Sequence, residues 1–221
     1  MTTRFVAKME DVLDVYVRPY DPKRPVVGLD EKPKDLQASV AADQPEPAIP
    51  GQPGREVMRQ DYEYKPQGLA TIFLAVEPLQ GTYWAAVSND RTGATFAHHL
   101  KTLVDDVYAT ADAVVLVTDN LNTHGPWSLY EVFPPAEAKR IADRIEWHYT
   151  PEHGSWLNVA EIGLSILQRQ CLRRRIPDSD TLDHEVQAWV AERKQKQVTI
   201  NWQFTTADAR IKLRRLYPIL E

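Results

Sequence analysis

Three acidic residues, Asp30, Asp119 and Glu161, stand where carboxylates can do chemistry. Asp30 is the last residue of an expected strand at 26–30, and Asp119 directly follows an apolar strand at 113–118. Glu161 falls in the first turns of an expected helix. Carboxylates that converge in space repel one another unless a cation neutralises them. The pattern therefore predicts a hard divalent cation acting on phosphate esters, with these three residues as metal ligands and catalytic residues.

Each acid taken alone has an ordinary structural explanation. Asp119 is suited to a turn or a cap after a strand. Asp30 is followed by Glu31 and Lys32, which together read as a solvated charged turn. Glu161 can interact with the dipole at the start of its helix. The combination of two strand ends and one helix start is more specific than any single residue.

Three polar residues beside the acids are candidates for supporting roles. His124 follows Asp119 by five residues and could orient a phosphate or the attacking water, or could be a loop histidine that hydrogen-bonds the backbone. Asn120 and Asn158 could bind metal-bound water or substrate, or could form a turn and a helix cap. The segment 153–155 contains a histidine and a serine, but a nucleophilic serine is not expected, and Ser155 is interpreted as a helix cap.

The order of the predicted strands and helices indicates an α/β fold, with a mixed sheet flanked by helices. Hydrophobic patterns predict strands at 26–30, 69–76, 82–87, 113–118 and 145–149, with helices at 91–108, 136–144, 156–171, 179–193 and 206–216. The segment 198–204 is expected to be extended. In such a sheet the first and fourth strands can be neighbours, and the helix after the fifth strand can carry its acid over their ends.

The chain is expected to have three parts. Residues 1–24 form an N-terminal helical arm, with helical spacing at 4–16. Residues 25–172 form the catalytic domain, interrupted at about 38–67 by an irregular excursion rich in proline and glycine. Residues 173–221 form a basic helical extension.

Composition sets the broad class of the protein. The 221 residues are 43% hydrophobic, which is enough for a sizeable core, and no apolar run is long enough for a membrane span or a signal peptide. The single cysteine, Cys171, excludes an internal disulfide and is interpreted as a buried thiol in a reducing compartment. These features predict a soluble cytoplasmic protein.

The net charge of −5 is unevenly distributed. From Glu161 to the C-terminus, eleven basic residues face eight acidic ones, so the acidic excess lies in the part that holds the predicted metal site. Local patches decide contact with DNA. The candidate DNA-binding residues are Arg173, Arg174, Arg175, Lys212, Arg214 and Arg215, although a solvated face explains the three consecutive arginines equally well.

Four segments carry a resemblance to a known family, and two of them are quite specific. The run Val-Leu-Val-Thr-Asp-Asn-Leu-Asn-Thr-His at 115–124 resembles the second-aspartate segment of bacterial insertion-sequence transposases related to the mariner group. The run from Tyr149 to Glu161, with its Trp-Leu-Asn triplet, resembles their third-acid segment. Residues 27–31 are similar to the first segment, and 204–213 are similar to the family's closing segment.

The resemblance implies a ribonuclease H-like fold with a mixed five-stranded sheet, and a DDE-type site that binds two Mg²⁺ ions, or Mn²⁺, through Asp30, Asp119 and Glu161. It implies cleavage of double-stranded DNA at element ends, followed by transfer of the 3′-hydroxyl strand into target DNA, commonly at a TA dinucleotide. A homodimer is expected because two DNA ends must be paired. A bacterial, nucleoid-associated location follows from the same resemblance.

The chain departs from the family pattern at its N-terminus. Members usually carry a helix-turn-helix region that reads the terminal repeats, and the residues before the first strand are too few for one. The chain therefore resembles a catalytic half alone, which could be a second reading frame, a split product or a decayed remnant. A separate helix-turn-helix polypeptide could supply the missing region. The alternatives are a nuclease of the same fold that cuts without transposing, and an inactive DNA-binding remnant.

Overall fold

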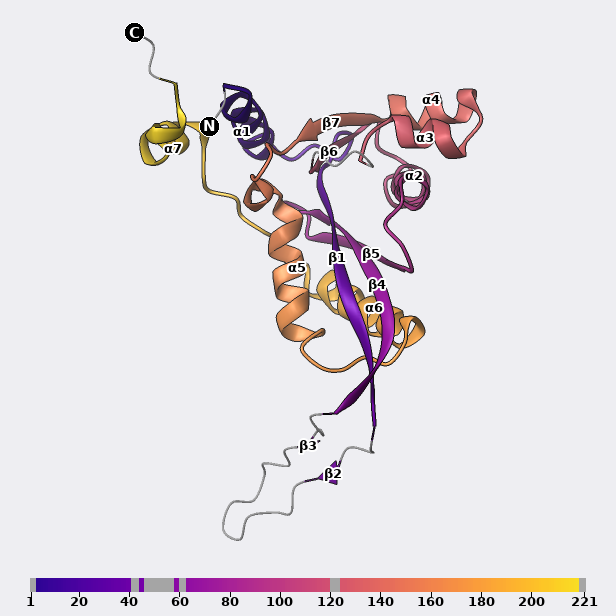
Figure 1. Ribbon diagram of the computed structural model, residues 1–221. Coiled ribbons are helices and arrows are strands. Elements are labelled where there is room, and N and C mark those ends of the chain that lie inside the picture. The colour runs from indigo at the N-terminus through magenta and orange to yellow at the C-terminus, as the bar shows by residue number, and fades with distance from the viewer. Residues whose placement is uncertain (1–2, 41–43, 46–57, 60–62, 120–123, 219–221) are drawn as a thin grey trace.

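The computed structural model describes residues 3–40, 44–45, 58–59, 63–119 and 124–218. In this part of the chain, helices cover both faces of a five-stranded sheet (Figure 1). In spatial order the strands are β5 (Thr82–Ser88), β4 (Tyr64–Glu77), β1 (Val26–Ser39), β6 (Val114–Thr118) and β7 (Ile145–Tyr149). Strand β4 is antiparallel to β1 and β5, whereas β6 is parallel to β1 and β7. The predicted mixed five-stranded sheet is confirmed, and the first and fourth predicted strands, β1 and β6, are neighbours.

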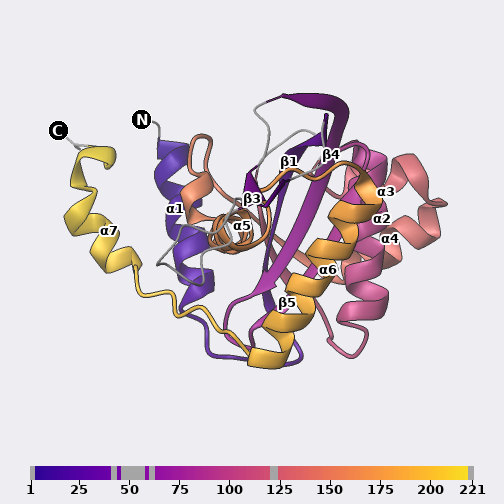
Figure 2. The same ribbon diagram turned by 90° about the horizontal axis from the view of Figure 1, so that it is seen from below.

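Each face of the sheet has its own layer of helices (Figure 2). One layer contains α2 (Gly93–Thr102), α3 (Trp127–Val132) and α4 (Pro135–Asp143), and the other contains α1 (Thr3–Tyr16), α5 (Val159–Gln170) and α6 (Ser179–Lys196). The remaining elements are a π-helical turn η1 (Leu103–Val107), two 3₁₀ turns η2 (Ser155–Leu157) and η3 (Arg214–Leu216), helix α7 (Thr206–Lys212), and the paired two-residue strands β2 (Gln44–Pro45) and β3 (Met58–Arg59).

Strand β4 explains why both faces need a cover. Successive side chains of a strand point to opposite faces, and β4 is apolar on both. Phe73 and Ala75 join the core with α2, whereas Ile72, Leu74 and Val76 join the core with α5 and α6. A strand that is hydrophobic on both sides is stable only when it is buried between two layers.

The first strand is longer than the sequence predicts. Strand β1 does not end at Asp30 but continues to Ser39, because it pairs with β4 from Gly28 to Ser39. The interpretation of residues 30–32 as a charged turn is therefore wrong. The same pairing places residues 38–39 and 64–67 in strands, although the sequence predicts irregular structure there. Most of the remaining excursion lies outside the described residues.

Helix α5 also differs from its prediction. The expected start near Ser155 or Trp156 is the short turn η2, and α5 begins at Val159 with Asn158 as its N-cap, so Ser155 is not the cap. The helical spacing of Val159, Ile162 and Ile166 predicts an apolar stripe, but Ile162 is 37% exposed. The buried face consists instead of Val159, Ala160, Gly163, Leu164 and Leu167.

Several other elements differ in detail. The helix predicted at 91–108 is α2 followed by the π-helical turn, and α3 was not predicted at all. Asp178 caps α6 through the backbone N–H of Thr181. The segment 198–204 forms no strand, and 206–216 is divided between α7 and η3. Cys171 is half-buried just beyond the end of α5.

The N-terminal helix α1 is packed into the body of the molecule. Its buried residues share a core with β6 and with the start of α5, and Asp11 Oδ2 lies 2.8 Å from Nδ1 of His148 on β7. The domain boundaries given above stay predictions. No helix in the described part of the chain is long and apolar enough to cross a bilayer.

Candidate metal centre

The sheet places Asp30 and Asp119 at the same level on neighbouring strands. In the parallel pairing of β1 with β6, Gly28 lies opposite Val117, so the residues two positions further along each chain, Asp30 and Asp119, also correspond. Parallel strands bring their carboxyl ends to one edge of the sheet. Asp30 is buried, with 8% of its surface exposed, and Asp119 is partly exposed.

Asn158 ties the start of α5 to Asp30. Its Oδ1 accepts a hydrogen bond from the backbone N–H of Ala160 at 3.1 Å and so caps the helix. Its Nδ2 donates to the carbonyl of Leu29 at 2.9 Å and to Asp30 Oδ2 at 3.3 Å. Asn158 thus serves as the helix cap and as a partner of the candidate ligand, and Glu161 lies in the first turn of the helix that Asn158 caps.

The close approach of α5 to β1 depends on Gly28. A Cβ at this position would lie 2.5 Å from Cγ1 of Val159 and 2.8 Å from Oδ1 of Asn158, closer than atoms can pack. On the other side of the helix start, the buried hydroxyl of Tyr16 accepts a hydrogen bond from the Val159 N–H at 2.9 Å. Residues from β1 and α1 therefore fix the position of the helix start.

The electrostatics of Asp30 show that the acids influence one another. Burial raises the pKa of Asp30 to about 8, and repulsion from Glu161, Glu31 and Asp119 adds to the rise. The backbone N–H of Glu31 donates to Asp30 Oδ1 at 2.9 Å and opposes the shift. A carboxyl group in this setting is neutral at pH 7 unless a cation compensates its charge.

Asp119 is held by His124. Nδ1 of the buried His124 forms a short hydrogen bond with Asp119 Oδ1, and Nε2 lies 3.4 Å from Glu31 Oε2. The imidazole ring also stacks on Phe96, with 4.4 Å between centroids and 28° between planes. His124 is therefore an ordered residue that contacts two acids, and neither sequence interpretation anticipated its contact with Glu31.

The remaining predicted site residues are Asn120 and the six candidate DNA-binding residues. Asn120 lies outside the described residues. Arg174 pairs with Glu185, while Arg175 donates to the carbonyl of Glu63 at 3.0 Å. Nζ of Lys212 lies 3.4 Å from Oδ1 of Asp208. Arg173, Arg214 and Arg215 are exposed.

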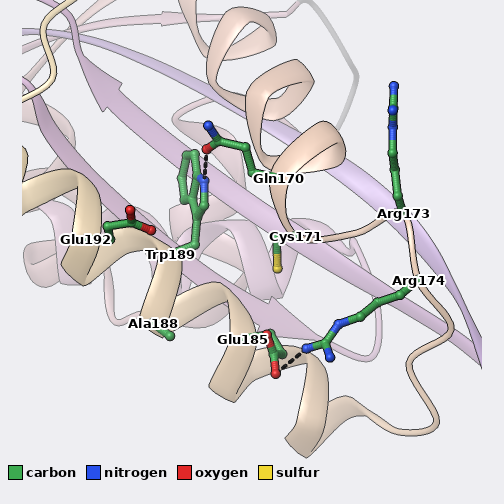
Figure 3. A pocket seen from close by; sticks show the side chains of 8 residues that line it. All are labelled: Gln170, Cys171, Arg173, Arg174, Glu185, Ala188, Trp189 and Glu192. Atoms are coloured by element: carbon green, nitrogen blue, oxygen red, sulfur yellow. Dashed lines mark hydrogen bonds and ion pairs between the residues drawn. The ribbon is translucent and has the colours of Figure 1, made fainter. Parts of the chain in front are cut away.

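The six predicted DNA-binding residues form two separate groups. Arg173, Arg174 and Arg175 lie beyond the C-terminal end of α5, and the other three lie around α7, beside α1 (Figure 1). Arg173 and Arg174 line a cavity of about 890 Å³ between the end of α5 and α6 (Figure 3). The two groups therefore do not make one continuous basic patch.

The chemistry of the acids fits a divalent cation. Oxygen ligands are what Mg²⁺ and Mn²⁺ prefer, and the buried carboxyl group of Asp30 is repelled by Glu161, Glu31 and Asp119, a repulsion that a cation would relieve. The described residues contain no set of three acidic, histidine or cysteine side chains already arranged to hold one ion. The acids thus form a repelling, partly buried group.

A family model for DDE superfamily endonucleases matches residues 5–183. The chain belongs to the DDE superfamily endonuclease family. No curated protein gives a significant match. Among solved structures, the fold is similar to the mariner Mos1 paired-end complex with Mg, with a TM-score of 0.59 at 13% identity over 100% of this chain and 65% of that one.

Two further Mos1 structures have the same fold. The strand transfer complex gives a TM-score of 0.56 at 15% identity, covering 88% of this chain and 56% of that one. The pre-cleavage transpososome gives 0.56 at 12% identity, covering 100% and 65%. The chain thus spans between 56% and 65% of the length of these Mos1 chains. The ribonuclease H-like fold predicted from the sequence is confirmed.

The sequence patterns do not single out Glu31 or Phe96 as site residues. Glu31 follows Asp30 directly, and recognising that β1 continues past Asp30 would have placed the two side chains on opposite faces of the strand. The role of Phe96 had no local signal, because its contact with His124 joins α2 to the segment after β6.

Proposed function

We propose that this chain is the catalytic domain of a transposase that cuts DNA strands and joins them to target DNA. The observation that carries the proposal is the hydrogen bond from Asn158 to Asp30, which joins β1 to the start of the helix that contains Glu161. Strand β1 also pairs with β6, the strand that precedes Asp119, and repulsion from Glu161 and Asp119 contributes to the raised pKa of Asp30. Membership of the DDE endonuclease family and the mariner-type fold support it.

In this proposal, Asp30, Asp119 and Glu161 hold two Mg²⁺ or Mn²⁺ ions. Bound there, the ions would supply activation of the attacking oxygen and stabilisation of charge on the leaving oxygen. The hydrogen bond from Asn158 holds Asp30 next to the start of α5. The paired strands β1 and β6 fix the spacing of the two aspartates. Burial of Asp30 excludes bulk water from one side of the site.

The proposed substrate is double-stranded DNA, and the proposed contacts are phosphate contacts. Five members of the predicted set are exposed, namely Arg173, Arg174, Lys212, Arg214 and Arg215. Arg174 and Lys212 lie in ion pairs with acidic side chains. The homodimer and the TA target belong to the same proposal and are implied by the family resemblance. Light scattering of the purified chain with and without DNA would test the dimer.

A plasmid assay tests the proposal. The purified protein is incubated with supercoiled plasmid that carries the DNA flanking its gene, in Mg²⁺, in Mn²⁺ or in chelator. Strand-transfer products that require metal and disappear in Asp119→Asn support a transposase. The matched control is Asp35→Asn, which changes an exposed aspartate on the same strand as Asp30 and should remain active.

Other outcomes identify the alternatives. Nicked or linear plasmid without strand transfer indicates a nuclease of the same fold. If the wild-type protein and Asp119→Asn bind DNA equally and neither cuts in either metal, the chain is a DNA-binding remnant and the proposed enzyme activity is refuted.

A further inference from the structure

Glu31 is a buried carboxylate that is not one of the proposed metal ligands. Its side chain is 6% exposed, and Oε2 has no hydrogen-bond partner in the described part of the chain. Burial raises the pKa of Glu31, while His124 and Arg91 oppose the rise. A buried carboxylate oxygen that makes no hydrogen bond costs on the order of 1–3 kcal/mol, which an ion-pair contact such as the one with His124 can offset. Its environment therefore needs an explanation beyond packing.

His124 connects Glu31 with Asp119. Its Nε2 lies 3.4 Å from Glu31 Oε2, which is an ion-pair distance, and its Nδ1 is hydrogen-bonded to Asp119 Oδ1. Phe96 covers one face of the ring. The ring is fixed in its plane by Phe96 and at its far edge by Glu31, so Nδ1 is directed at Asp119.

Asp119 directly follows Thr118, the last residue of β6. The sheet therefore fixes its backbone on one side, and the bond from His124 fixes its carboxylate. A metal ligand whose carboxylate is held by a neighbouring group is oriented before the ion arrives, and removal of such neighbours typically weakens metal binding about 10–100-fold.

We propose that Glu31 and His124 are positioning residues that orient Asp119 for the divalent cation. Glu31 acts through His124, and neither residue contacts the reacting atoms. This inference rests on the proposed function, because it assumes that Asp119 is a metal ligand.

The experiment measures Mn²⁺ affinity by isothermal titration calorimetry without DNA, so that its readout is independent of cleavage. His124→Phe keeps an aromatic ring against Phe96 and removes both nitrogens. Glu31→Gln keeps the shape of Glu31 and removes its charge. Each variant should bind Mn²⁺ about 10–100-fold more weakly than the wild type. The Asp35→Asn control should bind like the wild type.

The direction of the effects separates positioning from simple charge. Removing a basic group near a cation site should strengthen cation binding, so weaker binding by His124→Phe indicates positioning. The double variant should lose no more than His124→Phe alone, because Glu31 acts through the ring. Independent charge effects would instead add.

The inference is overturned if His124→Phe binds Mn²⁺ as tightly as the wild type, or if the two losses add. If His124→Phe does not fold, Glu31→Gln decides alone, and unchanged affinity in that variant overturns the inference. A wild-type protein that binds no Mn²⁺ and cuts no DNA refutes the proposed function itself. A wild type that binds Mn²⁺ and cuts, with variants that match it, refutes only the roles of Glu31 and His124.

Discussion

The burial of Asp30 predicts that the metal-free protein is less stable at high pH. Its pKa rises from an ordinary value of 3.8 to about 8 in the folded state. Folding therefore favours the protonated form, and the stabilising contribution is complete below about pH 4 and is lost as the pH rises through about 8. At about 1.4 kcal/mol per pKa unit, the total loss is on the order of 5 kcal/mol.

Asp30→Asn should remove this pH dependence. The amide cannot ionise, although it loses one of the two acceptor oxygens that Asn158 and the Glu31 N–H use, at a pH-independent cost of about 1 kcal/mol. The variant should be slightly less stable than the wild type near pH 4. It should be more stable by several kcal/mol at pH 9.

Urea unfolding in chelator at pH 4, 7 and 9, followed by tryptophan fluorescence, measures the difference. Comparison of the two proteins at each pH cancels the other titrating groups, and Asp35→Asn on the same strand should run parallel to the wild type. If the free-energy difference between Asp30→Asn and the wild type changes by less than about 1 kcal/mol from pH 4 to pH 9, Asp30 is not buried against other acids. The repulsion among carboxylates that a cation would relieve is then absent from the protein.

Three further predictions concern the start of α5 and the basic residues. Gly28→Ala should destabilise the protein by about 1–3 kcal/mol in urea unfolding and reduce cleavage, because the added methyl meets the helix start, including the backbone of Ala160. Gly163→Ala, whose nearest neighbours are side-chain carbons, should cost less. Asn158→Ala should cost about 1–3 kcal/mol in urea unfolding, since it removes the helix cap and a buried partner of Asp30, and an unchanged stability would contradict that role. Alanine at Arg173 together with Arg215 should lower the slope of log affinity for DNA against log salt by about 2 in fluorescence anisotropy, and an unchanged slope would exclude both as phosphate contacts.

Local sequence patterns determined most of the secondary structure. The apolar runs before Asp30 and Asp119 specify strands, because only a strand buried on both faces accepts such a continuous sequence. The sequence only narrowed the strand order, since the hairpin of β4 and β5 and the alternation of β6 and β7 with helices leave few topologies, in which β1 and β6 can be neighbours. Helix starts were less predictable. Ser155 and Asn158 are both good caps by type, and only contacts with β1 select Asn158.

The candidate acids could also be chosen from sequence, because Asp30, Asp119 and Glu161 occupy ends or starts of predicted elements. The electrostatic repulsion between these acids could not be predicted from the sequence. It depends on parallel pairing between β1 and β6 and on the close packing that Gly28 permits, and both are contacts between distant segments. The lengthening of β1 past Asp30 is likewise decided by pairing with β4, since the residues after Asp30 are charged and carry no strand pattern of their own.

By itself, then, the sequence determined the class of fold and which carboxylates are available for chemistry. Tertiary structure alone decided how those carboxylates are held. Glu31, Phe96 and His124 come from three different segments, and no periodicity links them. Burial and mutual repulsion, which raise the pKa of Asp30, arise only when the segments pack together, because the strength of an electrostatic interaction depends on distance and on exclusion of water.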